Sequence, residues 1–175
     1  MIGAAFDLAE PLKLKTVDYR LHQPMWAFFT DRKMDISFVK WKVVKYLNGK
    51  GSGLHKDVES LPANSGGLYL FFIKCPVIGG LTEFPFYIGR AQFTTTQNLK
   101  KRCKEYFQKY AKTSERPKIT RMIKYWGKDL FLAYYPIKSN KTIQSLEKQL
   151  INSLLLPMND EIPEKIIRQA KKAFQ

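Results

Sequence analysis

Glu147 is the residue whose type and position point most directly to chemistry. It follows Ile143 by four residues and precedes Leu150 by three, so a helix through this stretch places Glu147 on its apolar face. A charged group that faces a protein core destabilises the fold unless it is paired or holds a cation. The sequence leaves two interpretations: a buried ion pair with an arginine, or a carboxylate that holds a hard divalent metal such as Mg²⁺.

Two arginines are candidates to act beside this carboxylate. Arg102 lies three residues after Leu99 and four before Tyr106, so the helical repeat points it toward the sheet. One interpretation of Arg102 is a structural arginine that neutralises Glu147. Arg90 cannot release its proton in a protein, so it can stabilise charge on a phosphate but cannot be a base. The alternative for Arg90 is an exposed cation in a basic groove.

Two tyrosines stand beside glycines in neighbouring strands. The runs Gly67–Ile73 and Phe84–Ile88 are short, apolar and rich in β-branched and aromatic residues, and a turn-forming segment that contains Pro76 separates them. This pattern predicts two antiparallel strands joined by a loop. Tyr69 lies in the first strand and Tyr87 in the second. Tyrosines in strands are usually core residues with the hydroxyl at an edge, and the alternative is a pair of catalytic hydroxyls.

The elements that must position these residues follow from hydrophobic periodicity and from turn residues. In chain order they are a helix over Asn98–Ala111, a helix from Pro117 to Gly127, a strand over Asp129–Ile137, a helix from Lys141 or Thr142 to Pro157, and a tail helix from Pro163. The tail helix is expected to bury its apolar face, which consists of Ile166, Ile167, Ala170 and Phe174.

Residues 1–60 form an N-terminal addition in this interpretation, and residues 61–175 form the main domain. Leu12–Leu21 alternates apolar and polar residues, which predicts a half-buried strand. Asp35 is predicted to cap a helix that runs to Leu47, although the β-branched content of that stretch leaves a strand open. The glycine-rich stretch 48–53 is a flexible break between the two parts. The addition could contact DNA or determine specificity.

The tripeptides Gly67-Leu68-Tyr69 and Tyr87-Ile88-Gly89, in this order, resemble the signatures of the GIY-YIG nuclease superfamily. The segment Asn98–Phe107 resembles the corresponding helix in the nuclease domain of bacterial excision-repair incision proteins. The resemblance covers the chain from Leu61 to Asn159. It implies an α/β fold in which helices flank a small, three-stranded, mainly antiparallel sheet.

The resemblance also implies a role for each candidate. Tyr69 would be the general base that activates water, and a lowered pKa would be needed for that role near neutrality. Tyr87 would position water or phosphate. Arg102 would bind the scissile phosphate, with Tyr106 one helical turn later. Glu147 would hold the metal, one Mg²⁺ or Mn²⁺ ion per active site.

Three features complete the comparison with the family. Asn159 resembles the trailing asparagine that braces the site by hydrogen bonds, and its alternative is a turn residue after Pro157. Arg90 stands where family members often have lysine or histidine. The stretch 90–97 is several residues longer than in the repair proteins.

The charge of the chain points to a polyanionic partner. Its 175 residues include 30 Lys and Arg and 15 Asp and Glu, a formal net charge of +15. Such an excess favours nucleic acid first and an anionic membrane surface second. Residues 98–128 contain eleven Lys and Arg but only two Glu. The outward face of the two helices in this stretch is predicted to bind DNA phosphates through Lys100, Lys101, Lys104, Lys118, Arg121 and Lys124.

The sequence therefore predicts a divalent-metal-dependent DNA endonuclease of the GIY-YIG type, with restriction, defence or mobile-element cleavage favoured as its role by association. The alternatives are a structure-specific repair nuclease, a catalytically weak nucleic-acid-binding module and a basic adaptor in a protein complex. Double-stranded DNA is the expected partner, and a homodimer or an accessory protein stays open. No apolar run is long enough to span a membrane, and Cys75 and Cys103 form no disulfide framework, so a cytoplasmic location is expected.

Overall fold

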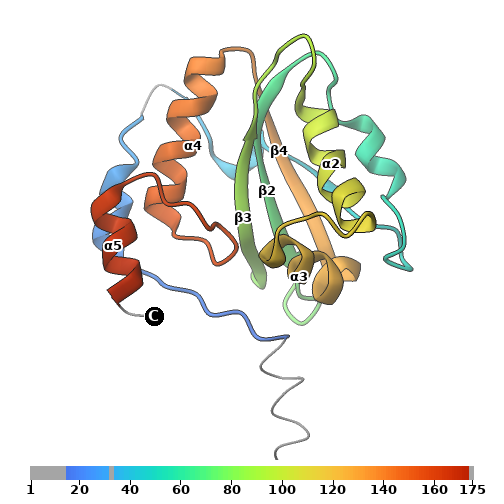
Figure 1. Ribbon diagram of the computed structural model, residues 1–175, viewed down its shortest axis with the longest axis horizontal. Helices are drawn as coiled ribbons and strands as arrows, with labels where there is room; N and C mark the ends of the chain where they lie inside the picture. The colour runs from blue at the N-terminus through green and yellow to red at the C-terminus, as the bar shows by residue number, and fades with distance from the viewer. Residues whose placement is uncertain (1–14, 32–33, 174–175) are drawn as a thin grey trace, which may run out of the picture.

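A four-stranded antiparallel sheet lies between two layers of helices in the computed structural model, which describes residues 15–31 and 34–173 (Figure 1). The strand order is β1-β4-β2-β3. The strands are β1 (Lys42–Lys45), β2 (Gly66–Lys74), β3 (Glu83–Ala91) and β4 (Leu130–Ile137). The α-helices are α2 (Leu99–Ala111), α3 (Pro117–Trp126), α4 (Asn140–Leu154) and α5 (Lys165–Ala173). The 3₁₀ helices are η1 (Gln23–Phe28), η2 (Phe38–Lys40), η3 (Lys56–Ser60) and η4 (Gly127–Asp129).

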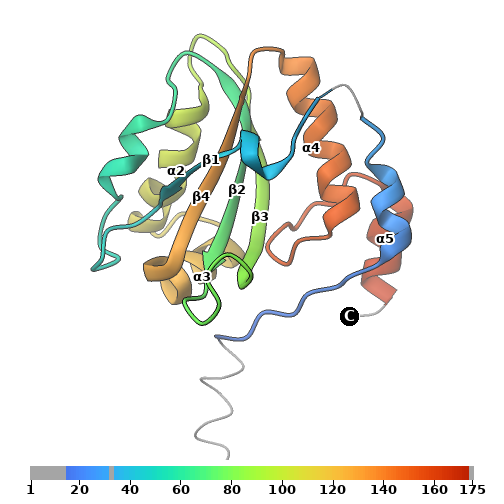
Figure 2. The same ribbon diagram turned by 180° about the vertical axis from the view of Figure 1, so that it is seen from behind.

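The helices cover both faces of the sheet, and Figure 2 shows the same layers from behind. Alternate residues of β2 enter different cores, because successive side chains of a strand point to opposite faces. Tyr69 and Phe71 belong to the core beneath α2 and α3, whereas Leu68 packs with Ile143 of α4. This double burial explains why β2 is almost continuously apolar in sequence.

The prediction of three strands is wrong, because the sheet has a fourth strand, β1, from within residues 1–60. β1 pairs antiparallel with β4, and Val44 stands opposite Leu132. The helix predicted from Asp35 to Leu47 is also wrong, because this stretch forms the short η2 followed by β1. The strand that the β-branched residues had left open is the correct interpretation of Lys42–Lys45. Its pairing with β4 decides the conformation of this short stretch.

Residues 42–60 pack into the same core as the residues that follow them. Val58 of η3 and Leu61 are buried in the cluster that contains Tyr69, and Leu47 forms an isolated bridge with Leu54. The strand predicted over Leu12–Leu21 is absent from residues 16–21, and residues 12–14 lie outside the described part of the chain.

The helices downstream of β3 confirm the predictions with small shifts at their ends. α2 begins directly after Asn98, whose side chain accepts a hydrogen bond from the backbone N–H of Lys101. α3 begins at Pro117 as predicted. α4 begins at Asn140 and ends at Leu154, and Leu155 follows in a left-handed conformation (φ 48°).

The tail helix is confirmed as an element but not in every buried position. α5 begins at Lys165, two residues after Pro163. Ile167 is buried as predicted, whereas Ile166 is 74% exposed, so its predicted burial is wrong. The side chains of Ala170 and Phe174 lie outside the described part. Within the described ranges, no helix has the length and apolar character that crossing a membrane requires.

We expect Gly89→Ala to destabilise the fold by about 1–3 kcal/mol through overpacking. Gly89 stands opposite Tyr69 in the β2–β3 ladder, and a Cβ at position 89 would lie 2.6 Å from the Tyr69 hydroxyl and 2.7 Å from its Cζ. The buried Tyr69 ring would therefore have to move. Urea unfolding measures the loss, with Gly79→Ala as the control because a Cβ there meets nothing within 4 Å. Equal stability of the two variants would contradict this packing argument.

Candidate active site

Three tyrosine hydroxyls meet beneath α2. The Tyr69 and Tyr106 hydroxyl oxygens are 2.7 Å apart, and the Tyr106 hydroxyl donates to the Tyr87 hydroxyl at 3.2 Å. The three residues come from β2, β3 and α2, and all three are buried. The sequence-predicted Tyr69, Tyr87 and Tyr106 therefore form one hydrogen-bonded chain rather than three separate core residues.

Burial sets the protonation of this chain. It raises the pKa of Tyr69 well above the usual value, and the neighbouring tyrosines act in the same direction. The pKa of Tyr106 is raised too, chiefly by burial. The charge of Arg102 lowers both pKa values without reversing the shift. Tyr69 is therefore a neutral hydroxyl near neutral pH, and its environment works against the predicted role as general base.

Arg102 lies behind the tyrosines and is half-buried. Its Nη1 contacts Glu105 Oε2 at 3.0 Å, and its Nη2 donates to the Tyr106 hydroxyl at 3.4 Å. Its guanidinium carbon is 5.0 Å from the centre of the Tyr106 ring. The interpretation of Arg102 as the ion-pair partner of Glu147 is wrong, because Glu105 takes that place.

The partner of Glu147 is Arg90. Arg90 Nη1 lies 2.9 Å from Glu147 Oε2, and the two side chains are 32% and 18% exposed. Burial raises the pKa of Glu147, while the charges of Arg90 and Arg102 act against that rise. The buried ion pair with an arginine, one of the two interpretations of Glu147, thus exists, and it joins the end of β3 to the middle of α4.

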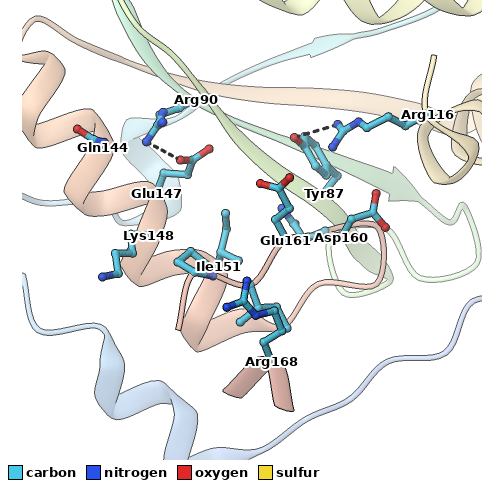
Figure 3. A pocket seen from close by; sticks show the side chains of 13 residues that line it. Tyr87, Arg90, Arg116, Gln144, Glu147, Lys148, Ile151, Asp160, Glu161 and Arg168 are labelled. Carbon is cyan, nitrogen blue, oxygen red and sulfur yellow. Dashed lines mark hydrogen bonds and ion pairs between the residues drawn. The ribbon is translucent and has the colours of Figure 1, made fainter. Parts of the chain in front are cut away.

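A cavity of about 510 Å³ opens beside this pair (Figure 3). Tyr87, Arg90, Glu147 and Asn159 line it, together with the segment 160–163 and the exposed sides of α4 and α5. The structure therefore brings four of the sequence-predicted site residues into one cavity. The other three, Tyr69, Arg102 and Tyr106, lie behind Tyr87 and do not line it.

Asn159 fastens the chain after α4 to the free edge of β3. Its side-chain oxygen accepts from the Ile88 backbone N–H at 3.0 Å, and its side-chain nitrogen donates to the Ile88 carbonyl at 2.8 Å. The backbone N–H of Met158 donates to the Phe86 carbonyl at 3.0 Å. These hydrogen bonds satisfy backbone groups of β3, which is an edge strand and has no neighbouring strand on this side. They also agree with the bracing that the family resemblance implies, which a simple turn residue would not provide.

Arg116 is a cavity residue that the sequence interpretation missed. Its Nη2 donates to the Tyr87 hydroxyl at 3.3 Å, and its guanidinium carbon is 5.5 Å from the centre of the Tyr87 ring. The sequence placed it only among the basic residues between the two helices. No spacing rule could have found it, because the α2–α3 turn decides where its side chain points.

The predicted DNA-binding face is already partly engaged within the protein. Glu59 contacts both Lys100 (2.9 Å) and Lys104 (2.7 Å), and their hydrogen bonds lower the pKa of Glu59 to about 2. Lys118 contacts Asp160 at 3.0 Å. Lys101 donates to the Thr96 carbonyl, Arg121 donates to the Thr16 carbonyl, and Lys124 is exposed above the Tyr125 ring. Lys124 is thus the most open cation of the six.

The donor groups suit a metal held by few protein ligands. No group of three or more His, Cys, Asp or Glu side chains in residues 15–31 and 34–173 could hold a metal ion. Glu147, Asp160 and Glu161 are the carboxylates that line the cavity, and the Glu147 side chain is 18% exposed. Mg²⁺ commonly binds through one or two carboxylates, substrate phosphate and water, so a single carboxylate fits such an ion.

Comparisons with known proteins add no family to this picture. No protein-family model matches the chain, and no curated protein or solved structure is significantly similar to it. The function must therefore be inferred from the residues and their geometry.

We expect Glu59→Gln to strengthen binding to duplex DNA, because it removes the ion pairs of Lys100 and Lys104 with the Glu59 carboxylate and one negative charge. The slope of log K against log salt should steepen by about one to two units as freed cations reach phosphates. Fluorescence anisotropy across a salt series in Ca²⁺ measures this slope. Asp129→Asn, an exposed carboxylate in η4, is the control with the same change of charge. An equal effect of both variants would show that α2 makes no phosphate contacts.

Proposed function

We propose that this chain is a divalent-metal-dependent DNA endonuclease of the GIY-YIG type, which hydrolyses phosphodiester bonds in duplex DNA. One observation carries the proposal: a single cavity unites Tyr87, Arg90, Glu147 and Asn159. These residues come from three parts of the chain, β3, α4 and the segment after α4, and the family resemblance assigns all four to one site.

The charges of the cavity suit a phosphodiester. Arg90 and Arg116 supply fixed positive charge and directional hydrogen-bond donors, which stabilise negative charge that develops on phosphate oxygens. Such groups act more strongly where water is excluded, and the cavity walls are partly buried. The arrangement therefore favours the charge of a phosphoryl transition state over that of a neutral substrate.

Glu147 would hold the Mg²⁺ or Mn²⁺ ion. A bound divalent ion supplies Lewis-acid stabilisation of the leaving oxygen in such hydrolysis. The Arg90 guanidinium opposes the rise in the pKa of Glu147 that burial causes. It therefore favours the charged form of Glu147, which metal binding requires.

The tyrosine chain would position the attacking water. Tyr87 presents its hydroxyl to the cavity, and Tyr106 connects that hydroxyl to Tyr69. We propose that Tyr69 acts through this chain by holding Tyr106, and through it Tyr87, in the orientation that places the water. Its raised pKa means that Tyr69 keeps its own proton near neutrality, so it orients the water and does not accept the proton that the water loses to solvent.

We expect wild-type protein to nick supercoiled plasmid in Mg²⁺ and to leave it intact in excess chelator. Glu147→Gln should lower the cleavage rate by at least about 10²-fold, the scale typical for one electrostatic contributor. It should leave DNA affinity in Ca²⁺ within a few-fold, because the substitution preserves shape and leaves the cationic surface in place. Gel analysis of nicked and linear plasmid measures the rate.

Glu164→Gln is the matched control, since it removes a carboxylate outside the cavity lining. Thermal unfolding of both variants checks that the fold survives, because Glu147→Gln removes the partner of Arg90. Undiminished cleavage by a folded Glu147→Gln protein would refute the assignment of the metal ligand. Tight binding without cleavage by wild type would favour the non-catalytic DNA-binding module instead.

A further inference from the structure

Arg116 and the Arg90–Glu147 pair occupy different sides of the cavity, with Tyr87 beside Arg116 (Figure 3). Arg116 is the residue directly before α3, and Arg90 lies at the end of β3. The Arg116 side chain is 43% exposed, so it reaches solvent while it contacts the Tyr87 hydroxyl. Two guanidinium groups therefore face one cavity from separate elements.

Arg116 is held in place without using all of its donors. Its Nε lies 3.5 Å from Glu115 Oε1, and the Glu115 side chain is only 5% exposed. The same carboxylate oxygen accepts from the Arg116 backbone N–H at 2.9 Å. Nη2 donates to Tyr87, and no contact within the described residues engages Nη1. A guanidinium carries five N–H donors, so several remain for an anion.

The N-terminal turn of α3 is also tied to the segment after α4 that lines the cavity. Lys118 Nζ contacts Asp160 Oδ1 at 3.0 Å and the Pro157 carbonyl at 3.4 Å. Asp160 follows Asn159, which is bonded to β3. This bridge fixes the position of Arg116 relative to the cavity and reduces the reorganisation needed when an anion binds.

Arg102 has a different position. Its guanidinium contacts Glu105 and the Tyr106 hydroxyl, and it does not line the cavity. Tyr106 in turn donates to Tyr87, so Arg102 is separated from the cavity by two tyrosines. A phosphate in the cavity would meet Arg116 before it met Arg102.

We propose that a DNA backbone phosphate binds in this cavity at Arg116, beside the Tyr87 hydroxyl, and that Arg116 makes the direct contact that the family resemblance assigns to Arg102. Arg102 is then a positioning residue that orients Tyr106 and, through it, Tyr87. This inference rests on the proposed endonuclease function and specifies its phosphate site. The remaining donors of the Arg116 guanidinium, beside the Tyr87 hydroxyl, suit an oxygen-rich anion such as a phosphate.

Neutralisation of one phosphate tests the contact. The phosphate that wild type cleaves is first mapped on a short duplex in Mg²⁺, and a second duplex carries an uncharged methylphosphonate at that linkage. Dissociation constants for both duplexes are measured in Ca²⁺ with wild type, Arg116→Gln, Arg102→Gln and Lys112→Gln. Lys112 is an exposed cation at the end of α2, so Lys112→Gln is the control for loss of one charge.

We expect the methylphosphonate to weaken wild-type binding by at least about tenfold, since it removes a charged hydrogen-bond acceptor. Arg116→Gln should bind both duplexes with nearly equal affinity, because its contact is already lost. Arg102→Gln and Lys112→Gln should keep the wild-type penalty. Arg116→Lys, which keeps the charge on a shorter donor set, should show an intermediate penalty and guards against a folding defect in Arg116→Gln.

Each other outcome has a distinct meaning. A full penalty in Arg116→Gln, or a penalty lost only in Arg102→Gln, would overturn the assignment of the phosphate contact and leave the endonuclease proposal standing. A wild-type chain that cuts no DNA in Mg²⁺ would overturn both proposals together.

Discussion

The burial of the Glu147 carboxylate is the constraint on which the candidate site depends. Burial raises the pKa of Glu147, and the Arg90 guanidinium at 2.9 Å opposes that rise. Loss of either partner would leave a charge in a poorly hydrated place, which is costly. The distance between α4 and the end of β3 must therefore be kept constant. The apolar contacts of α4 with β2 and β3, in which Ile143, Leu146 and Ile88 are buried together, provide that rigidity.

The site also requires side chains from both faces of the sheet, and one strand, β3, supplies them. Tyr87 and Arg90 are both in β3, yet they point to opposite faces, because they are separated by three residues. Tyr87 belongs to the core beneath α2 and α3, and Arg90 meets α4. Only at an edge strand can side chains from both faces border the same cavity. The bonds between Asn159 and Ile88 close that edge without covering the cavity.

Much of this arrangement could be predicted from the sequence, because a long helix with a regular apolar repeat can be recognised from its sequence alone. The apolar stripes of α2, α3 and α4 extend over several turns, and the position of Glu147 on such a stripe marked it as unusual. The order of the strands in the sheet could not be obtained in this way. β1 is four residues long, and its Val43 and Val44 suit a strand or a short helix until β4 provides the pairing partner.

The contacts of the charged residues were the least predictable part. An ion pair with an arginine was one of two interpretations of Glu147, and sequence spacing could not distinguish Arg90 from Arg102 as the partner. That choice depends on how far each side chain reaches between packed elements. Arg116 was missed for the same reason, since the turn between α2 and α3 directs it to Tyr87. The raised pKa of Tyr69 also emerges only when its neighbours are known, because burial is its largest cause.

Whether Glu147 is a metal ligand, and not only the partner of Arg90, can be tested without DNA. Electron paramagnetic resonance measures the concentration of free Mn²⁺ in separate titrations with wild type, Glu147→Gln and Glu164→Gln at neutral pH. The account predicts one saturable Mn²⁺ site per chain in wild type and in Glu164→Gln, and loss of that site in Glu147→Gln. Equal Mn²⁺ binding by all three proteins would show that the buried carboxylate is structural, and would contradict the account.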